Sequence, residues 1–275
     1  MNLIIPFTLN NAEVRGRFIK LDSQLDSILN QHNYPEPVAK LLGELLMVAS
    51  LIGTQFKEEV TLTIQLQGKD KNKYIVVDYQ FPNYIRGYAK FDPEDKPDLL
   101  MITIDRKNSE RYQGIIDANG LSISEAMERY FIQSEQIGTC LKLAIGKVIS
   151  PDKAESWVAG GIMIQKLPEV NELTWEEAKA FFNTIRDDEL LDPNLSQEKL
   201  LYSLYHEMEV IAYDSIKIIY KCRCSKEKAI QIIISLGYDN IKDYMIDNKI
   251  SIDCQFCNKS QKFSLKQVKN ILNIS

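Results

Sequence analysis

The sequence predicts an α+β protein: a large N-terminal domain with an antiparallel sheet and packed helices, then a helical linker, then a small C-terminal domain containing four cysteines. Short segments of strand-like composition recur between residues 60 and 167, with turn residues between them. From about residue 168 the apolar spacing becomes helical, and four of the five cysteines follow residue 220. These changes place the predicted boundaries at 1–167, 168–220 and 221–275.

The first 60 residues are expected to supply one strand and two helices. Residues 15–21 alternate in the manner of a half-buried strand. A helix is predicted next, with Asp22 or Ser23 near its N-cap. Residues 36–53 are apolar around most of a helical circumference, which predicts a buried helix.

The middle of the N-terminal domain is expected to be mostly β-structure. Short polar or Pro-containing turns separate the strand-like segments, which favours an antiparallel arrangement. One helix is predicted at 122–136, where Ile123, Met127 and Tyr130 fall on one face. The predicted strands are 60–68, 72–80, 84–91, 99–105, 111–117, 140–149 and 157–167.

The predicted linker, residues 168–220, combines short helices with charged turns. Thr174 and Glu177 have the spacing of a capping box, and Ser196 is a second candidate N-cap. The acidic segment 186–194 is expected to separate the two helices. Short helices bury little apolar surface by themselves, so the linker is expected to depend on a neighbouring domain for its stability.

Charge is distributed unevenly along the 275 residues. The last 55 residues carry ten basic and five acidic side chains, whereas the first 220 carry 23 basic and 33 acidic ones, for a net charge of −5 overall. This contrast indicates a separate C-terminal module that could attract nucleic acid or the acidic body of the protein. The sequence shows neither a convincing secretory signal nor a long apolar run, so we expect a cytoplasmic protein without membrane association.

The cysteines of the C-terminal module are arranged as C-x-C, 29 residues, C-x-x-C: Cys222, Cys224, Cys254 and Cys257. Two thiol pairs on separate turns can supply the tetrahedral ligands of a structural zinc ion. The alternatives are unrelated free thiols and an iron–sulfur cluster, although the spacing does not match the common ferredoxin patterns. Structural disulfides are rare in the cytosol, which favours a zinc domain with four cysteine ligands.

The rest of the C-terminal module is predicted to contain two short helices and two short strands. Ser225 can cap the first helix, Gly237 can end it and Asp239 can cap the second. Residues 249–254 and 262–265 read as strands that frame the second cysteine pair. A module of this size has little apolar core, so a bound metal would stabilise it.

A zinc site of this kind is also compatible with redox chemistry. Zinc holds cysteine sulfur as thiolate, the form that peroxide and hypochlorous acid oxidise. In C-x-C and C-x-x-C a second thiol lies one or two residues away and can convert a sulfenic acid to a disulfide. The metal would then lose its ligands, together with a folding energy of about 10–16 kcal/mol in small zinc domains. The site could therefore act as a switch or serve a purely structural role.

The other candidate residues favour structural roles, and no enzymatic activity is expected. Cys140, isolated on a predicted strand, is expected to be a packed core thiol. The segment 206–210, HEMEV, begins like a zinc-protease motif but lacks the second histidine. Neither a phosphate-binding loop nor a G-x-S-x-G motif is found.

Motifs of one known family are spread over nearly the whole chain, at 15–22, 32–46, 86–92, 110–117, 130–139, 159–168, 200–207, 222–225 and 254–258. The joined cysteine pattern with the preceding Tyr-His-Glu is the most specific of them. Together they resemble the 33-kDa heat-shock protein family, the redox-regulated holdase chaperones. One departure follows the second cysteine pair, where Gln261-Lys262-Phe263 replaces the usual Tyr-x-Phe ending.

The resemblance implies a specific function. Cys222, Cys224, Cys254 and Cys257 would bind one Zn²⁺ when reduced, and oxidation would form the disulfides Cys222–Cys224 and Cys254–Cys257. Zinc would then be released, the C-terminal domain would unfold, and the linker would detach from the N-terminal domain. The resemblance gives the N-terminal domain the roles of substrate binding and dimerisation. The exposed apolar surface would hold unfolding client proteins without ATP, as a homodimer. The alternative is a zinc-ribbon nucleic-acid-binding protein, suggested by the basic C-terminal module.

Overall fold

The computed structural model describes residues 1–107, 109–150, 153–168 and 170–274. The chain forms two compact units, Met1–Tyr220 and Lys221–Ser275. The first unit contains two sheets, the helices packed on them and the whole predicted linker. The second unit contains the four clustered cysteines.

The first sheet of the larger unit has the order β10-β1-β2-β9-β8, and β11 also pairs with β1. All of its pairs are antiparallel. Its longest strand, β9, pairs with β2 on one side and with β8 on the other. The strands are β1 (Leu3–Leu9), β2 (Val14–Leu21), β8 (Thr139–Ser150), β9 (Lys153–Lys166), β10 (Ile211–Ala212) and β11 (Ile216–Lys217).

The second sheet has the order β12-β5-β4-β3-β6-β7. Its neighbours are antiparallel except β12, which lies parallel to β5. The antiparallel arrangement predicted for the strands between residues 60 and 91 is therefore confirmed, and these strands form the centre of this sheet. The strands are β3 (Val60–Gly68), β4 (Tyr74–Gln80), β5 (Tyr84–Lys90), β6 (Pro97–Arg106), β7 (Tyr112–Asp117) and β12 (Ile219–Tyr220).

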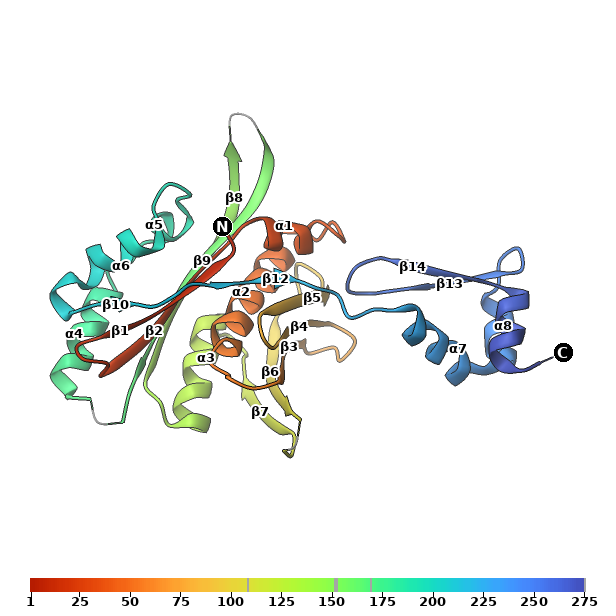
Figure 1. Ribbon diagram of the computed structural model, residues 1–275, viewed down its shortest axis with the longest axis horizontal. Coiled ribbons are helices and arrows are strands. Elements are labelled where there is room, and N and C mark those ends of the chain that lie inside the picture. Colours follow the sequence, from red (N-terminus) through yellow and green to blue (C-terminus); the bar gives the residue numbers. More distant parts are fainter. Residues whose placement is uncertain (108, 151–152, 169, 275) are drawn as a thin grey trace. The chain divides into compact units, whose positions relative to one another are not determined.

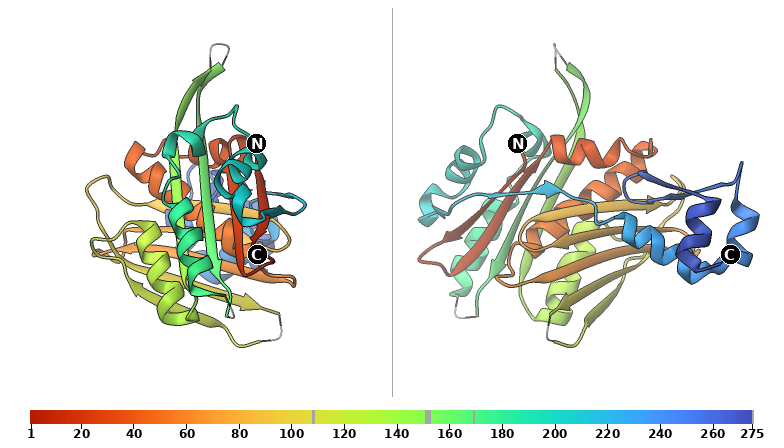
Figure 2. Two further views of the ribbon diagram at one scale, coloured as in Figure 1. Left: turned by 90° about the vertical axis from the view of Figure 1, so that its left-hand side faces the viewer. Right: turned by 45° about the vertical axis from the view of Figure 1, so that its right-hand side comes forward.

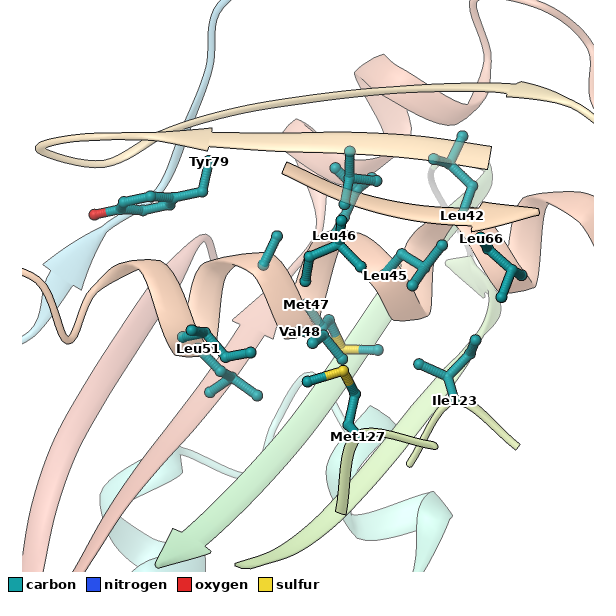
Figure 3. Packing of buried hydrophobic residues seen from close by; sticks show 14 of the residues in the cluster. Leu42, Leu45, Leu46, Met47, Val48, Leu51, Leu66, Tyr79, Ile123 and Met127 are labelled. Atoms are coloured by element: carbon teal, nitrogen blue, oxygen red, sulfur yellow. The ribbon is translucent and has the colours of Figure 1, made fainter. Parts of the chain in front are cut away.

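Helix α2 (Glu36–Gly53) lies between the two sheets and contacts strands of both. Its side chains are buried around most of the helix, as predicted, because it has a sheet on either side. Figure 3 shows Leu46 and Met47 on α2 among side chains from β3, β4 and α3. The remaining helices of this layer are α1 (Ser23–Leu29) and α3 (Ile123–Tyr130), and α3 continues into a π-helical turn, Phe131–Glu135.

The linker helices cover the opposite face of the first sheet (Figures 1 and 2). They are α4 (Glu172–Phe182), α5 (Asp187–Leu191) and α6 (Gln197–Tyr205), followed by a 3₁₀ turn, His206–Met208. Side chains from the sheet and from these helices form a second apolar cluster, distinct from the one around α2. The first sheet therefore has apolar side chains on both faces.

The smaller unit has a correspondingly small core. Helix α7 (Lys226–Ile241) is kinked at Gly237, which has a φ of 73°, and a 3₁₀ turn follows at Lys242–Tyr244. A hairpin of β13 (Lys249–Asp253) and β14 (Ser260–Ser264) leads into α8 (Leu265–Leu272). The buried apolar side chains of this unit are Ala229, Ile233, Ile241, Ile250, Phe263 and Val268.

The structure confirms the predicted α+β class and corrects several elements. Strand β1 was not predicted, because apolar side chains on both of its faces hide the alternation. The carbonyl of Pro6 in this strand points to the outer edge of β1. The N–H that proline lacks would point to the same edge, so its absence removes no hydrogen bond to β2. The acidic segment expected to be a turn contains the short helix α5, and the helix predicted at 122–136 stops being α-helical at Phe131.

Candidate metal centre

The four cysteines come from two separate turns of the smaller unit. Cys222 and Cys224 lie on the extended segment before α7, whose N-cap Ser225 accepts a hydrogen bond from the Lys228 main chain at 3.3 Å. Cys254 and Cys257 lie in the turn that joins β13 to β14. The N–H of Asn258 donates to the Cys254 carbonyl at 2.8 Å and closes this turn.

The sulfur atoms are close enough to share one ion. All four lie within 4.8 Å of one another. The Sγ atoms of Cys222 and Cys254 are 3.6 Å apart, and those of Cys224 and Cys257 are 3.4 Å apart. Zn–S bonds of about 2.3 Å in a tetrahedron place sulfurs about 3.8 Å apart, whereas a disulfide joins them at about 2.05 Å. The arrangement therefore fits four metal ligands, and all four residues are free thiols.

The four thiols influence one another's ionisation. Burial opposes ionisation of Cys222, but a hydrogen bond from the Cys224 main chain and others from the neighbouring thiols outweigh it and lower the pKa of Cys222 to about 7. Burial and the nearby sulfurs raise the pKa of Cys224 and of Cys257. One sulfur thus ionises readily while others hold their protons. A divalent cation supplies the positive charge that would let all four be thiolates.

A second feature of interest is the attachment of the linker to the first sheet. The Lys20 Nζ donates to the carbonyls of Asp192 and Leu195, both at 2.7 Å, and this lysine is only 6% exposed. In the opposite direction, the Gln197 side chain donates to the Phe18 carbonyl at 2.7 Å. Lys142 donates to the Ile185 carbonyl in the segment between α4 and α5. These polar contacts fix the linker at several points along its length.

Gly160 on β9 lets the linker approach the sheet closely. A Cβ placed on Gly160 would lie 2.3 Å from the carbonyl oxygen of Leu190 in α5. Neither Gly160 nor Lys20 was singled out as a functional residue from the sequence. Both residues contact the linker, and the residue spacing within their own strands does not reveal this contact.

The linker covers a continuous apolar face of the first sheet. We call this surface the covered face. Its side chains come from four adjacent strands, and the pairing register places them on one face because residues two apart in a strand share a face. They are buried in the cluster formed with the linker helices: Ile5, Phe7, Leu9, Val14, Phe18, Ala144, Ile162 and Ile164.

Cys140 lies at the margin of the covered face, remote in sequence from the other cysteines. It is half-buried and packs against the cluster formed with the linker helices. Burial raises the pKa of its thiol to about 11, so the thiol is protonated and unreactive in this state. This agrees with the packed role predicted for it.

The fold and the cysteine cluster define a class: an α+β protein with a small appended module that carries four cysteines close enough to hold a metal ion. Within residues 1–107, 109–150, 153–168 and 170–274, every helix is too short or too polar to serve as a membrane span. Comparison with known proteins narrows this class.

The family model described as Hsp33 protein matches residues 2–264. The chain is 34% identical to the 33 kDa chaperonin of Caulobacter vibrioides, covering 95% of this chain and 94% of that one. It is 31% identical to the 33 kDa chaperonin of Pseudomonas fluorescens, covering 96% and 91%. The crystal structure of the Thermotoga maritima 33 kDa chaperonin has the same fold, with a TM-score of 0.85 at 20% identity over 99% and 98% of the chains. The chain belongs to the Hsp33 chaperone family.

Proposed function

We propose that this protein is a redox-regulated, ATP-independent holdase, inactive when reduced and zinc-bound, and active when oxidised. The observation that carries the proposal is the covered face: an apolar surface that three short helices and their connecting segments bury, in a chain whose cysteine cluster follows those helices. A surface of this kind binds unfolded protein once it is uncovered.

The metal proposed for the cluster is Zn²⁺, held by Cys222, Cys224, Cys254 and Cys257. Four thiolates are a typical closed ligand set for structural zinc. When bound, the ion would stabilise the module by joining the segment before α7 to the β13–β14 turn. The six buried apolar side chains of the module form a core too small to replace that contribution.

Oxidation would convert the four ligands into two disulfides. In each, two thiolates form one S–S bond, and the two electrons released reduce one hydrogen peroxide, which takes up two protons and leaves as two water molecules. The proposed pairs are Cys222–Cys224 and Cys254–Cys257, as the family resemblance implies. A disulfide sulfur is a poor ligand compared with thiolate, so the metal would be released.

Loss of the metal would unfold the module and weaken the anchoring of the linker. The linker helices have only 5, 9 and 11 residues, lengths at which isolated helices are unstable in water. Once displaced from the sheet they would not persist as helices. The covered face would then be available to the apolar segments of unfolding clients, and dimer formation would enlarge the binding surface.

The proposal places the protein in the cytoplasm and gives it no enzymatic role. A reducing compartment keeps the four thiols available for metal until an oxidant appears. Binding needs no nucleotide, because the free energy for holding a client comes from apolar surface that the client itself exposes.

The direct test compares zinc-loaded and peroxide-treated protein for suppression of aggregation of a heat-unfolded client. Only the oxidised form is expected to suppress light scattering, with zinc release followed by a chromophoric chelator. Cys140→Ser is the matched control, since it removes a thiol outside the cluster and should behave like wild type. Cys254→Ser should bind zinc at least about tenfold more weakly and suppress aggregation before oxidation. Equal suppression by reduced and oxidised wild type would exclude the redox switch.

A further inference from the structure

The segment between the linker helices and the cysteine cluster crosses the edges of both sheets of the larger unit. We call residues Ile211–Tyr220 the strap. Its three strands contain two residues each: β10 and β11 pair with the outer edge of β1, and β12 pairs with β5 (Figure 1). Without the strap, β1 and β5 would be the terminal strands of their sheets.

Main-chain hydrogen bonds hold most of the strap in place. The N–H of Tyr213 donates to the Pro6 carbonyl and that of Ile218 to the Asn2 carbonyl, both at 2.9 Å. The N–H of Ile219 donates to the Asn83 carbonyl at 3.0 Å. All ten strap residues are described, and Ile218 is the only one whose side chain is buried. The strap is thus held by main-chain bonds, which do not depend on its sequence, and by a few side chains, among them Ile218 and Tyr220.

The strap bonds to the main-chain groups of β1 that face the outer edge. These groups belong to alternate residues: Ile4 pairs with Ile216, the Pro6 carbonyl accepts from Tyr213, and Thr8 pairs with Ile211. An extended client segment could pair with the same groups once the strap is displaced.

We propose that the outer edge of β1 is a client-binding site, where an extended segment of an unfolded protein adds as a strand, and that the strap occupies this site until the cysteine module opens. This inference rests on the proposed holdase function and specifies how a client is held. Strand addition suits clients of many sequences, because the main-chain groups that pair are common to all of them. An unfolded chain also has such groups unpaired.

The position of the strap connects this site to the cysteine cluster. Tyr220, the last strap residue, is separated from Cys222 by a single residue. While Cys222 is a metal ligand, the chain that follows the strap belongs to a folded module. When the module unfolds, the strap keeps only its own contacts with the larger unit: three two-residue strands, the buried Ile218 and the bonded Tyr220. Strands this short open readily.

The site also adjoins the covered face. Ile5 and Phe7 of β1 belong to that face, and they flank Pro6, whose carbonyl points to the outer edge. A client strand added to β1 would therefore extend the first sheet beside the surface that linker displacement uncovers. Main-chain pairing and apolar contact would then act on the same client segment.

Amide hydrogen exchange of the full-length protein tests the inference at named residues. The Asn2 and Pro6 carbonyls accept bonds from the strap, so the N–H groups of Ile4 and Thr8 point to the same edge. Oxidation is expected to speed their exchange at least about tenfold, and addition of unfolded client to restore the protection. Amides of β7, the opposite edge of the second sheet, serve as the internal control and should not respond to client.

Two outcomes must be told apart. If oxidised protein suppresses aggregation but Ile4 and Thr8 stay protected, or are exposed and not re-protected by client, strand addition at β1 is wrong while the holdase function stands. If oxidised protein fails to suppress aggregation, the proposed function itself fails.

A peptide pair tests main-chain recognition without any variant. An extended apolar peptide is compared with the same sequence N-methylated at alternate residues, which removes N–H donors and keeps every side chain. Strand addition predicts at least about tenfold weaker binding of the methylated peptide to oxidised protein. Equal binding would show that side chains alone are recognised and would overturn the inference.

A strap variant extends the test to the reduced protein. Ile218→Ser is expected to expose the Ile4 and Thr8 amides at least about tenfold while zinc remains bound, because it removes the one buried side chain of the strap. Lys217→Ala, at the exposed neighbouring position, is the matched control. Unchanged exchange in Ile218→Ser would show that the strap is held by something other than these contacts and would contradict the mechanism of release.

Discussion

Gly160→Ala should displace the linker without touching the cysteine cluster. The new Cβ would lie 2.3 Å from the Leu190 carbonyl oxygen and 2.9 Å from its carbon. Both are main-chain atoms, so they cannot turn aside as the end of a side chain can. A normal contact between such atoms is about 3.3 Å or longer. Helix α5 must therefore move away from β9 by roughly 1 Å.

The free energy of this displacement can be bounded from the contacts. Leu190 is 1% exposed and belongs to the cluster formed with the covered face. Overpacking of a close-packed contact costs about 1–3 kcal/mol. If the loss falls on linker docking, the population of undocked linker rises about 5–150-fold at about 1.4 kcal/mol per factor of ten.

Cys140 provides a local assay for this displacement. Its thiol packs against the linker cluster, and burial raises its pKa to about 11, so alkylation should be slow while the linker is docked. In the reduced, zinc-loaded protein, zinc protects the other four cysteines from the reagent. Labelling of Cys140 should be faster in Gly160→Ala by the factor given above, and partial suppression of client aggregation should appear without oxidation.

Gly146→Ala is the matched control for this variant. Gly146 lies on the neighbouring strand β8 and faces the same helix, but its Cβ would meet only the Leu191 Cδ1 at 3.3 Å, a methyl group that can move. It should label at nearly the wild-type rate. If both variants behave like wild type, the close approach of α5 to β9 does not hold the linker. If labelling rises but clients are not held, uncovering this face is insufficient for chaperone activity.

Three further predictions concern other contacts. Lys20→Met removes the donor to the Asp192 and Leu195 carbonyls and should weaken linker docking by about 2–3 kcal/mol, seen as faster Cys140 labelling; an unchanged rate would contradict a docking role. Burial raises the pKa of Glu44 to about 7, so the free energy of unfolding falls as pH rises from about 4.5 to 7. Urea unfolding should therefore give Glu44→Gln a free energy of unfolding about 2–3 kcal/mol above wild type at pH 8 and equal to wild type at pH 4. A zinc chelator added to reduced protein should speed amide exchange throughout Lys226–Leu272, and unaltered exchange there would exclude a structural metal.

The cysteine cluster could be predicted from the sequence because its information is local. Two closely spaced pairs, each beside a turn or a helix N-cap, constrain where four sulfurs can lie. Ser225 caps α7 as predicted, and Cys254 and Cys257 lie at the tip of a hairpin whose strands were expected. The structure brings the four sulfurs together, while their ligand and redox roles remain predictions.

The contacts of the linker could not be predicted because they join distant parts of the chain. Lys20 reads as an ordinary polar residue of an alternating strand, yet it is buried beneath residues about 170 positions later. Likewise, Gly160 lies on a predicted strand, but nothing within that strand shows that its neighbour is the α5 main chain. The strap has strands of only two residues, too short for any periodicity to reveal.

The most direct test of the account is a peroxide titration of reduced, zinc-loaded protein, in which free thiols, released zinc and client protection are measured on the same samples. The account predicts that four thiols disappear and one zinc is released for two peroxide molecules consumed, that client protection rises in proportion, and that peptide mapping finds Cys222 joined to Cys224 and Cys254 to Cys257. Full client protection at the start of the titration, with all thiols reduced and zinc bound, would contradict it.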